Sequence, residues 1–194
     1  MSTKNGRWFS LLSGAPWQVE RANPARSRKT LKMRQGITVQ IIKLVTSLAV
    51  CLLAGLAGSA FTATSIATWY EFLKKPSFSP PNWVFAPVWT TLFLMMGTAA
   101  FLVWRRGLGS ALVRRALITF LVQLILNVFW TFLFFKLHSP LYAFIEITVL
   151  WIAIAVTIVS FSRLSRPAAI LLIPYIVWVS FAAVLNLSIV RLNW

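Results

Sequence analysis

One carboxyl and three carboxamides lie inside long apolar stretches of this chain, where polar side chains are costly. A carboxamide in hydrocarbon loses free energy unless it forms a hydrogen bond, so Gln123, Asn127 and Asn186 are expected to face the inside of a helical bundle. Glu146 lies at membrane depth, where a charged carboxylate costs about 3 kcal/mol. It is therefore protonated, paired, or close enough to the interface to meet water. An acid at this depth indicates a functional site, and a structural hydrogen bond to a neighbouring helix explains it equally well.

Aromatic side chains accompany these polar groups on the same helix faces. Trp130 lies beside Asn127, and Gln123 is one turn earlier on that face. Flat aromatic faces next to amides are typical of a pocket for a planar, largely apolar molecule with a few polar edges. Structural hydrogen bonds between helices explain the amides nearly as well. Two further stretches repeat residues at steps of three and four along one face: Phe85, Trp89, Phe93 and Met96, and then Tyr175, Trp178, Ala182 and Asn186.

The chain is poor in side chains that ligate metals or attack substrates. It has one cysteine and one histidine, so neither an intrachain disulfide nor a thiolate metal site can form. Cys51 lies inside an apolar stretch, and His138 is interpreted as a solvated loop residue just before Pro140. No nucleophile–base pair is visible. The sequence therefore favours binding over catalysis, and it predicts no cofactor and no metal.

Five apolar stretches must position these residues. The chain has 194 residues, of which 59% are hydrophobic, and its mean hydropathy is +0.78, which is typical of an integral membrane protein. A helix needs about 20 apolar residues to cross the hydrocarbon core. The predicted spans are residues 38–61, 82–104, 116–136, 140–162 and 168–190. The predicted fold class is an all-α membrane protein, a bundle of five transmembrane helices.

Prolines and small residues divide and shape these spans. Pro140 and Pro167 lie where a first helical turn tolerates proline, so they mark the starts of the fourth and fifth helices. Pro87 and Pro174 lie within spans and are expected to kink them. The first span has two pairs of small residues with a spacing of four, Ala54 with Gly58 and Gly55 with Ser59. Such pairs permit close helix contact, either inside the bundle or at a dimer face.

The segment between the first two spans, residues 62–81, is the longest connection and is called the first loop. Its prolines, Pro76, Pro80 and Pro81, fix φ and restrict the preceding residues, so the loop has few conformations to lose on ordering. Trp69 and Tyr70 carry amphipathic rings that suit the headgroup level. The loop is either an interfacial anchor or a lid over a pocket, and the residues alone favour neither.

The net charge of +16 is unevenly distributed along the chain. Basic residues concentrate in residues 1–36 and in the connections after the second and fourth spans, whereas the other connections hold few. Cationic segments favour the cytoplasm, so the N-terminus is predicted to be cytoplasmic. We interpret the charge as a sign of topology and of contact with anionic lipid headgroups in the bilayer, and not of a nucleic-acid partner.

Residues 1–36 form a basic N-terminal extension, and residues 37–194 form the transmembrane domain. The polar, basic composition of residues 1–32 fits a disordered tail and equally an organellar transit peptide. Translation starting at Met33 is a third explanation. The sequence does not separate these three, and it leaves open which membrane holds the protein.

Three stretches together resemble one known family. WYEFLKKPSFSPPNWVFAPVWTTLFLMMG (residues 69–97) resembles the first-loop and second-helix signature of the TspO/MBR family, the tryptophan-rich sensory proteins, translocator proteins and peripheral-type benzodiazepine receptors. QLILNVFWTFLFF (123–135) and PYIVWVSFAAVLN (174–186) resemble its other signatures in the expected order. The resemblance implies a bundle of five helices, often dimeric, with a pocket beneath the first loop. It implies ligands such as porphyrins, sterols in some members, and benzodiazepine-type drugs.

The family resemblance also assigns ligand-binding positions in this chain. By motif match these are Tyr70 as a lid, Trp89, Phe93, Asn127, Trp130, Trp178 and Ala182 as pocket walls, and Glu146 where the family commonly has an acid. Gln123 is added from its place one turn before Asn127. Animal members have a tyrosine after the Leu-Asn pair of the fifth helix as part of a sterol-recognition pattern, whereas this chain has Leu187. The resemblance therefore supports porphyrins more than sterols.

The function expected from the sequence is binding of porphyrins or other tetrapyrroles in sensing, regulation or transport, by a homodimer. A porphyrin-degrading membrane enzyme is the alternative. An ion channel is disfavoured because the spans lack a string of ionisable residues.

Overall fold

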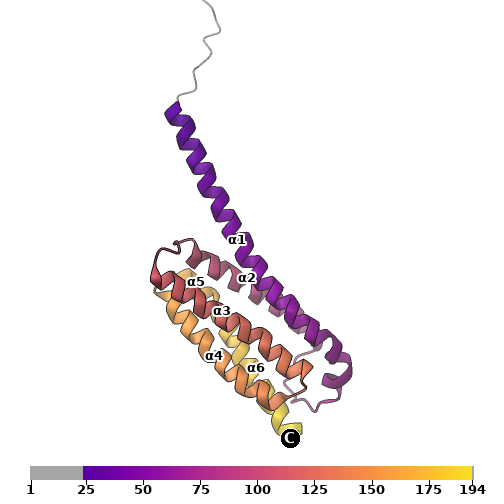
Figure 1. The fold of residues 1–194 in the computed structure, drawn as a ribbon. Coiled ribbons are helices and arrows are strands. Elements are labelled where there is room, and N and C mark those ends of the chain that lie inside the picture. The colour runs from indigo at the N-terminus through magenta and orange to yellow at the C-terminus, as the bar shows by residue number, and fades with distance from the viewer. Residues whose placement is uncertain (1–23, 194) are drawn as a thin grey trace, which may run out of the picture. The chain divides into compact units, whose positions relative to one another are not determined.

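The computed structural model describes residues 24–193. Residues up to Thr38 and residues from Val39 onwards are two separate units, and all further description concerns the second unit, here called the bundle. Its helices appear in Figure 1. They are α1 (Pro24–Ser65), which begins in the first unit, η1 (Ile66–Tyr70), η2 (Asn82–Val84), α2 (Phe85–Trp104), α3 (Ala111–Thr131), η3 (Phe132–Lys136), α4 (Pro140–Ser162), α5 (Arg166–Leu171) and α6 (Ile173–Asn193).

The predicted fold class is confirmed, because five helical segments of the described chain are long and apolar enough to cross a membrane. They are Met33–Ser65, Asn82–Trp104, Ala111–Lys136, Pro140–Ser162 and Arg166–Asn193. The predicted third span begins too late, since the helix starts at Ala111 and includes Arg114 and Arg115. Hydropathy excludes such arginines from a span, but a helix backbone does not end where its side chains become charged.

The prolines act at helix starts. Pro140 is the first residue of α4, and Pro167 lies in the first turn of α5, as predicted. Pro87 lies in the first turn of α2, where proline needs no kink. The fifth span is interrupted at Leu172, two residues before Pro174. Proline lacks the amide hydrogen that would continue the helix through this point.

Glycines bring α1 close to α2 inside the bundle. A Cβ atom added to Gly97 of α2 would lie 2.9 Å from the Cα atom of Leu48. One added to Gly55 of α1 would lie 2.6 Å from the Phe93 ring. Only glycine permits these approaches, so Gly55 and Gly97 are used for packing between α1 and α2.

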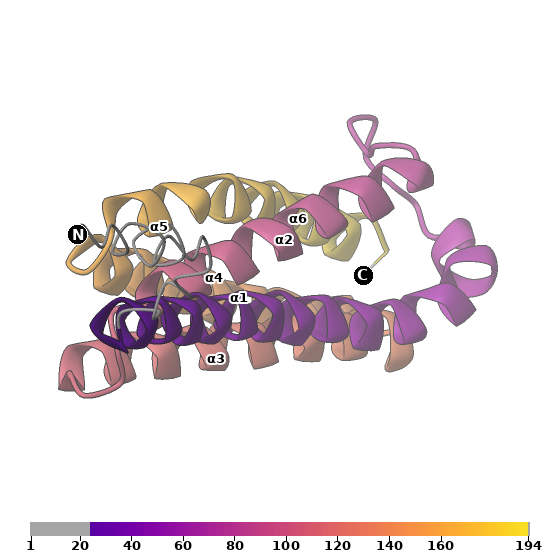
Figure 2. The same ribbon diagram turned by 90° about the horizontal axis from the view of Figure 1, so that it is seen from above.

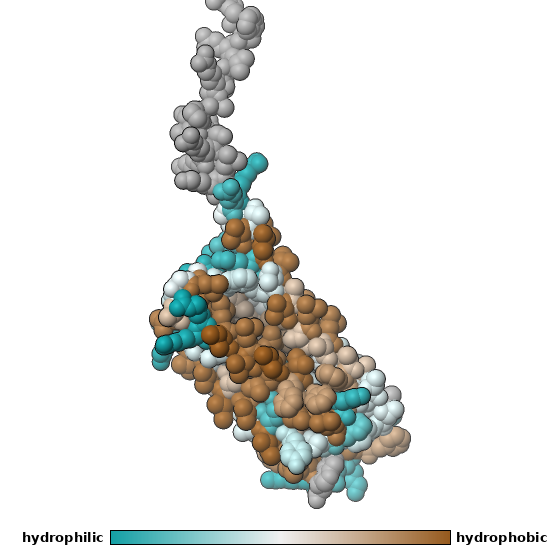
Figure 3. Space-filling model, in the orientation of Figure 1, coloured by the Kyte–Doolittle hydropathy of each residue, from teal (hydrophilic) through white to brown (hydrophobic). Residues whose placement is uncertain are grey.

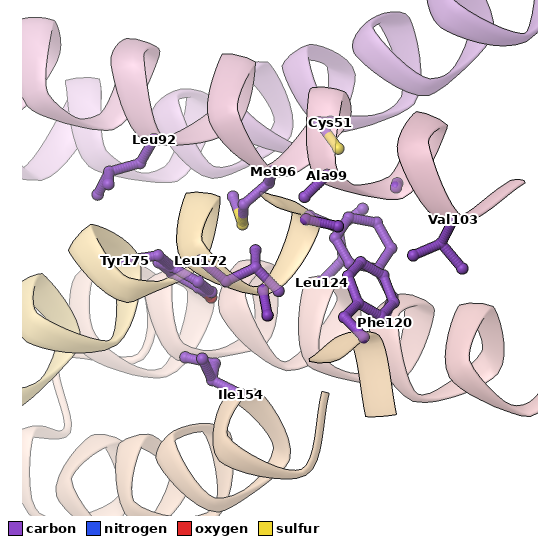
Figure 4. Packing of buried hydrophobic residues seen from close by; sticks show 14 of the residues in the cluster. Cys51, Leu92, Met96, Ala99, Val103, Phe120, Leu124, Ile154, Leu172 and Tyr175 are labelled. Atoms are coloured by element: carbon purple, nitrogen blue, oxygen red, sulfur yellow. The ribbon is translucent and has the colours of Figure 1, made fainter. Parts of the chain in front are cut away.

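The core has two clusters of buried side chains. The larger one runs from the middle of the bundle to the end opposite the first loop, and Figure 4 shows Met96 of α2, Leu172 between α5 and α6, and Tyr175 of α6 among its side chains. The smaller one lies at the first-loop end and is formed by Tyr70, Phe134, Ala143, Leu185 and Ile189. Trp130 packs against both clusters. Large apolar side chains are also exposed along the helices, and Figure 3 shows them as a band with hydrophilic residues toward its two ends. This pattern suits a surface facing lipid.

The first loop, the connection from η3 to α4 and the C-terminal end of α6 lie at one end of the bundle (Figures 1 and 2). The α2–α3 and α4–α5 connections lie at the other end. Helices α4 and α6 therefore run antiparallel. This arrangement places the first loop beside the ends of α3, α4 and α6, which carry most of the predicted site residues.

Candidate ligand-binding site

Two helices face each other with aromatic side chains. On α2, the rings of Trp89 and Phe93 have centroids 5.7 Å apart, and Trp89 meets Tyr175 of α6 edge-on at 6.3 Å. Phe85, at the start of α2, meets Trp178 of α6 edge-on at 6.1 Å. The predicted walls of α2 and α6 therefore do lie against each other, and they form an aromatic seam between the two helices.

Two of the three carboxamides have structural partners. Asn127 Nδ2 donates to the Tyr175 hydroxyl oxygen at 3.1 Å, which joins α3 to α6 in the buried core. In the amide orientation that satisfies both neighbours, Asn186 Nδ2 donates to the Pro140 carbonyl oxygen at 3.1 Å and Asn186 Oδ1 accepts from the Phe144 nitrogen at 3.0 Å, which joins α6 to α4. Interhelical hydrogen bonds, the alternative explanation, therefore account for these two amides.

Apart from the Gln40 amide oxygen on α1, four other buried polar groups form no hydrogen bond within residues 24–193: the Gln123 carboxamide, the Glu146 carboxyl and the indole nitrogens of Trp130 and Trp178. Gln123 is 1% exposed and Glu146 is 7% exposed. A buried polar group without a partner costs about 1–3 kcal/mol. These groups, two of them on α3 and one each on α4 and α6, are the ones that a bound molecule could satisfy.

Helix register places Glu146 opposite a small residue. Asn186 contacts Pro140 and Phe144, so the centre of that contact on α4 is near residue 142. Because α4 and α6 are antiparallel, moving one turn along α4 to Glu146 corresponds to moving one turn back along α6 to Ala182. The methyl group of Ala182 leaves more room beside the carboxyl than a larger side chain would.

Two short π-helices, η1 and η3, pack together at the first-loop end of the bundle. Ser65 Oγ donates to the Phe135 carbonyl oxygen at 2.7 Å, which ties the end of α1 to η3. Tyr70, the last residue of η1, is 5% exposed and packs against Phe134 and Phe135 of η3 at 6.2 and 5.7 Å. Tyr70 is therefore part of the core under the loop and not a headgroup anchor.

The first loop is held down over this end of the bundle. The Asn193 side chain forms two hydrogen bonds with the Lys74 backbone: Lys74 N donates to Asn193 Oδ1, and Asn193 Nδ2 donates to Lys74 O, both at 3.0 Å. Phe78 meets Phe181 of α6 edge-on at 6.3 Å. The loop therefore lies over this end of the bundle, and its role as a lid stays a prediction; we call the Asn193–Lys74 pair the latch.

A cation and a hydroxyl complete the surroundings of Tyr70. The Lys75 ammonium lies 4.6 Å from the centre of the Tyr70 ring. Burial raises the pKa of the Tyr70 hydroxyl above its ordinary value, and a hydrogen bond with the Ser79 side chain lowers it in part. The phenol is therefore neutral at physiological pH and binds the loop as a neutral hydroxyl.

Sequence reasoning missed two contributors to this end. His138 is exposed, as expected of a loop residue, but its ring also stacks on the Trp69 indole with centroids 4.5 Å apart. Its backbone has a φ of +49°, so the turn is fixed by tertiary contacts. Asn193 carried no signal either, because a single amide beside the chain end has no periodic context.

A model of the TspO/MBR family matches residues 47–192. The chain belongs to the TspO/MBR family. It is 46% identical over 154 residues to the tryptophan-rich protein TspO of Chlorobaculum tepidum, covering 79% of this chain and 98% of that protein. It is 43% identical over 155 residues to the tryptophan-rich protein TspO of Archaeoglobus fulgidus, covering 80% and 99%. It is 38% identical over 139 residues to the human translocator protein, covering 70% and 81%.

The family match covers all nine predicted site residues, and the structure brings them to one half of the bundle. Tyr70 lies beneath the first loop and Trp130 packs against the same cluster, while the register given above sets Glu146 of α4 opposite Ala182 of α6. Trp89, Phe93, Asn127 and Trp178 line the interior, and Gln123 is one turn deeper on α3 than Asn127. Their ligand-binding roles stay predictions.

An apolar groove of about 500 Å³ lies elsewhere on this TspO/MBR chain. It runs between α1 and α3, away from the aromatic seam, and its lining residues are Val50, Ala54, Phe61, Leu121, Leu124, Ile125, Val128, Phe129 and Phe132. It contains none of the predicted site residues and no polar side chain. The groove therefore has none of the hydrogen-bonding groups that the aromatic site offers.

Metal ligation has no candidate in the part of the chain that the structure describes. No group of three or more His, Cys, Asp or Glu residues within residues 24–193 could hold a metal ion. The chemistry offered by the site is stacking on aromatic faces together with hydrogen bonding at a few buried positions.

Proposed function

We propose that this TspO/MBR protein binds a porphyrin-type tetrapyrrole among its helices beneath the first loop, and acts through that binding in sensing, regulation or transport. The single observation that carries the proposal is the set of buried polar groups without partners beside the aromatic seam of α2 and α6. Two indole N–H donors and a carboxamide suit the polar edges of a flat molecule, and the seam suits its faces.

The charges at the mouth fit the anionic edge of such a ligand. Lys74 and Arg191 are exposed at the first-loop end, and Lys75 lies over Tyr70. A tetrapyrrole with its propionates at this end would place its apolar ring between the helices and its carboxylates near these cations. Relatives named tryptophan-rich sensory protein and translocator protein agree with a role in sensing or transport.

Titration of the purified protein with protoporphyrin IX, followed by quenching of tryptophan fluorescence, tests the proposal. We expect saturable binding that Trp89→Ala and Trp178→Ala each weaken at least tenfold, because each removes a stacking face and leaves a cavity. Trp104→Ala is the matched control, since Trp104 lies fifteen residues after Trp89 on the same helix, or about 22 Å away. Unchanged affinity in the Trp89 and Trp178 variants, with melting temperatures retained, refutes the assignment.

A further inference from the structure

The end of the bundle opposite the first loop carries a cluster of exposed arginines, here called the arginine end. It consists of Arg105, Arg106, Arg114, Arg115, Arg163 and Arg166, and each of these side chains is exposed. Arg105 and Arg106 directly follow α2, Arg114 and Arg115 lie near the start of α3, Arg163 follows α4, and Arg166 begins α5. Segments separated by about 60 residues in the chain thus contribute to one charged surface.

Packing beneath the surface holds these segments in place. Val103, Val113, Phe161 and Ala168 lie under the two connections, and each is at most 1% exposed. The Arg114 guanidinium donates to the Leu108 and Gly109 carbonyl oxygens at 2.8 and 3.1 Å. The α2–α3 connection is therefore a fixed turn, and the arginines project from a built surface.

This surface has no acidic residue to neutralise it. The chain has three acidic residues in all. Glu20 lies outside the described residues, Glu71 is in the first loop at the opposite end, and Glu146 is buried. A cluster of like charges repels itself and gains free energy when anions approach. Among the described residues no carboxylate neutralises the arginine end, so this surface attracts anions.

Neighbouring aromatic and apolar side chains place the arginine end at headgroup depth. The Lys43 ammonium lies 5.8 Å from the centre of the Trp104 ring, and the Arg105 guanidinium lies 5.8 Å from that of Phe101. Aromatic rings and long cations meet in this way where hydrocarbon gives way to water. Leu108 and Leu112, beside the arginines, are 49% and 57% exposed. A surface that combines arginines with exposed leucines fits lipid better than a purely polar polyanion.

We propose that the arginine end is a binding surface for the phosphates of anionic lipid headgroups. The surface is continuous with the membrane-spanning helices, so lipid phosphates lie at its level without any further docking step. Guanidinium groups bind phosphate oxygens through paired hydrogen bonds. The positive-inside rule predicts that this end faces the cytoplasmic leaflet, where anionic lipids are found.

Spin-labelled lipids measure this selectivity on the full chain reconstituted in phosphatidylcholine bilayers. Electron paramagnetic resonance gives the association of labelled phosphatidylglycerol relative to labelled phosphatidylcholine. The test variant is Arg106→Gln/Arg163→Gln/Arg166→Gln, and the matched control is Lys74→Gln/Lys136→Gln/Arg191→Gln, which removes three exposed cations from the opposite end. A cation near an anionic surface contributes on the order of fivefold to association before screening by salt.

We expect the parent protein to prefer phosphatidylglycerol severalfold, the arginine variant to lose most of that preference, and the control to keep it. The preference should also fall as salt rises from 0.1 to 1 M, since the screening length drops from about 10 to about 3 Å. Equal association of both lipids with the parent protein overturns the proposal, as does equal loss in the two variants. An oligonucleotide that binds the parent in phosphatidylcholine nanodiscs and is released from the arginine variant would overturn it in favour of nucleic acid. Protoporphyrin IX affinity is measured on the parent protein and the arginine variant, so that failure of this proposal is distinguishable from failure of the proposed function.

Discussion

Removing the latch should speed ligand release without weakening the fold. In Asn193→Ala, the first loop loses the two hydrogen bonds that Lys74 shares with Asn193, both at 3.0 Å. A typical hydrogen bond contributes a net 0.5–1.5 kcal/mol, so the closed loop loses about 1–3 kcal/mol relative to open forms. Because each 1.4 kcal/mol is a factor of ten, the open population rises roughly fivefold to 150-fold. If ligand leaves through the open loop, its dissociation rate rises by the same factor.

Stopped-flow fluorescence measures this rate. Protein loaded with protoporphyrin IX is mixed with an excess of a competing ligand that does not quench tryptophan, and recovery of tryptophan fluorescence reports release of the porphyrin. Asn193→Asp keeps the acceptor for Lys74 N–H and loses the donor, so it should give an intermediate rate. Leu192→Ala is the control, because Leu192 is adjacent and 44% exposed. A dissociation rate in Asn193→Ala equal to that of the control would refute the reasoning that the first loop gates the site.

Three further outcomes are expected. Gly97→Ala should lower the free energy of unfolding by about 1–3 kcal/mol, because the added Cβ atom would lie 2.9 Å from the Leu48 Cα atom. Gly109→Ala is the control and should leave the free energy of unfolding unchanged, because no atom lies within 4 Å of its added Cβ. Thermal melting measures both variants. Ala182→Leu should weaken protoporphyrin IX binding at least tenfold, because the larger side chain would fill the space beside Glu146. Val184→Leu, on the exposed face of α6, should leave binding unchanged. Equal affinities of the two variants would contradict the placement of Ala182 opposite Glu146. Protoporphyrin IX incubated with the protein in light and in darkness should be recovered intact, and a protein-dependent product in either condition would favour the enzyme alternative.

Helix number and order were predictable because hydrocarbon imposes a length and an apolar composition on every span. The boundaries were less so. Arg114 and Arg115 lie within α3 although hydropathy excluded them, because long cationic side chains reach water from inside a helix. Pro174 predicts a kink, and the structure has an interruption two residues earlier, at Leu172, because a missing amide hydrogen acts on the preceding turn.

Side-chain pairing at the site was less predictable than the helix faces. Periodicity put Trp89 and Trp178 on interior faces, and the structure joins those faces through Tyr175 and Phe85. It could not tell which amide has a structural partner: Asn127 bonds to Tyr175, whereas Gln123, one turn away, has no partner among the described residues. That difference depends on which side chains the neighbouring helices present, and the periodicity within one helix does not predict this.

A structure of the complex with protoporphyrin IX would locate the bound ligand. We expect the macrocycle between the aromatic residues of α2 and α6, beneath the first loop, with hydrogen bonds to the indole nitrogens of Trp130 or Trp178 or to Glu146. A macrocycle seated instead in the groove between α1 and α3, with Trp89 and Trp178 untouched, would contradict this placement.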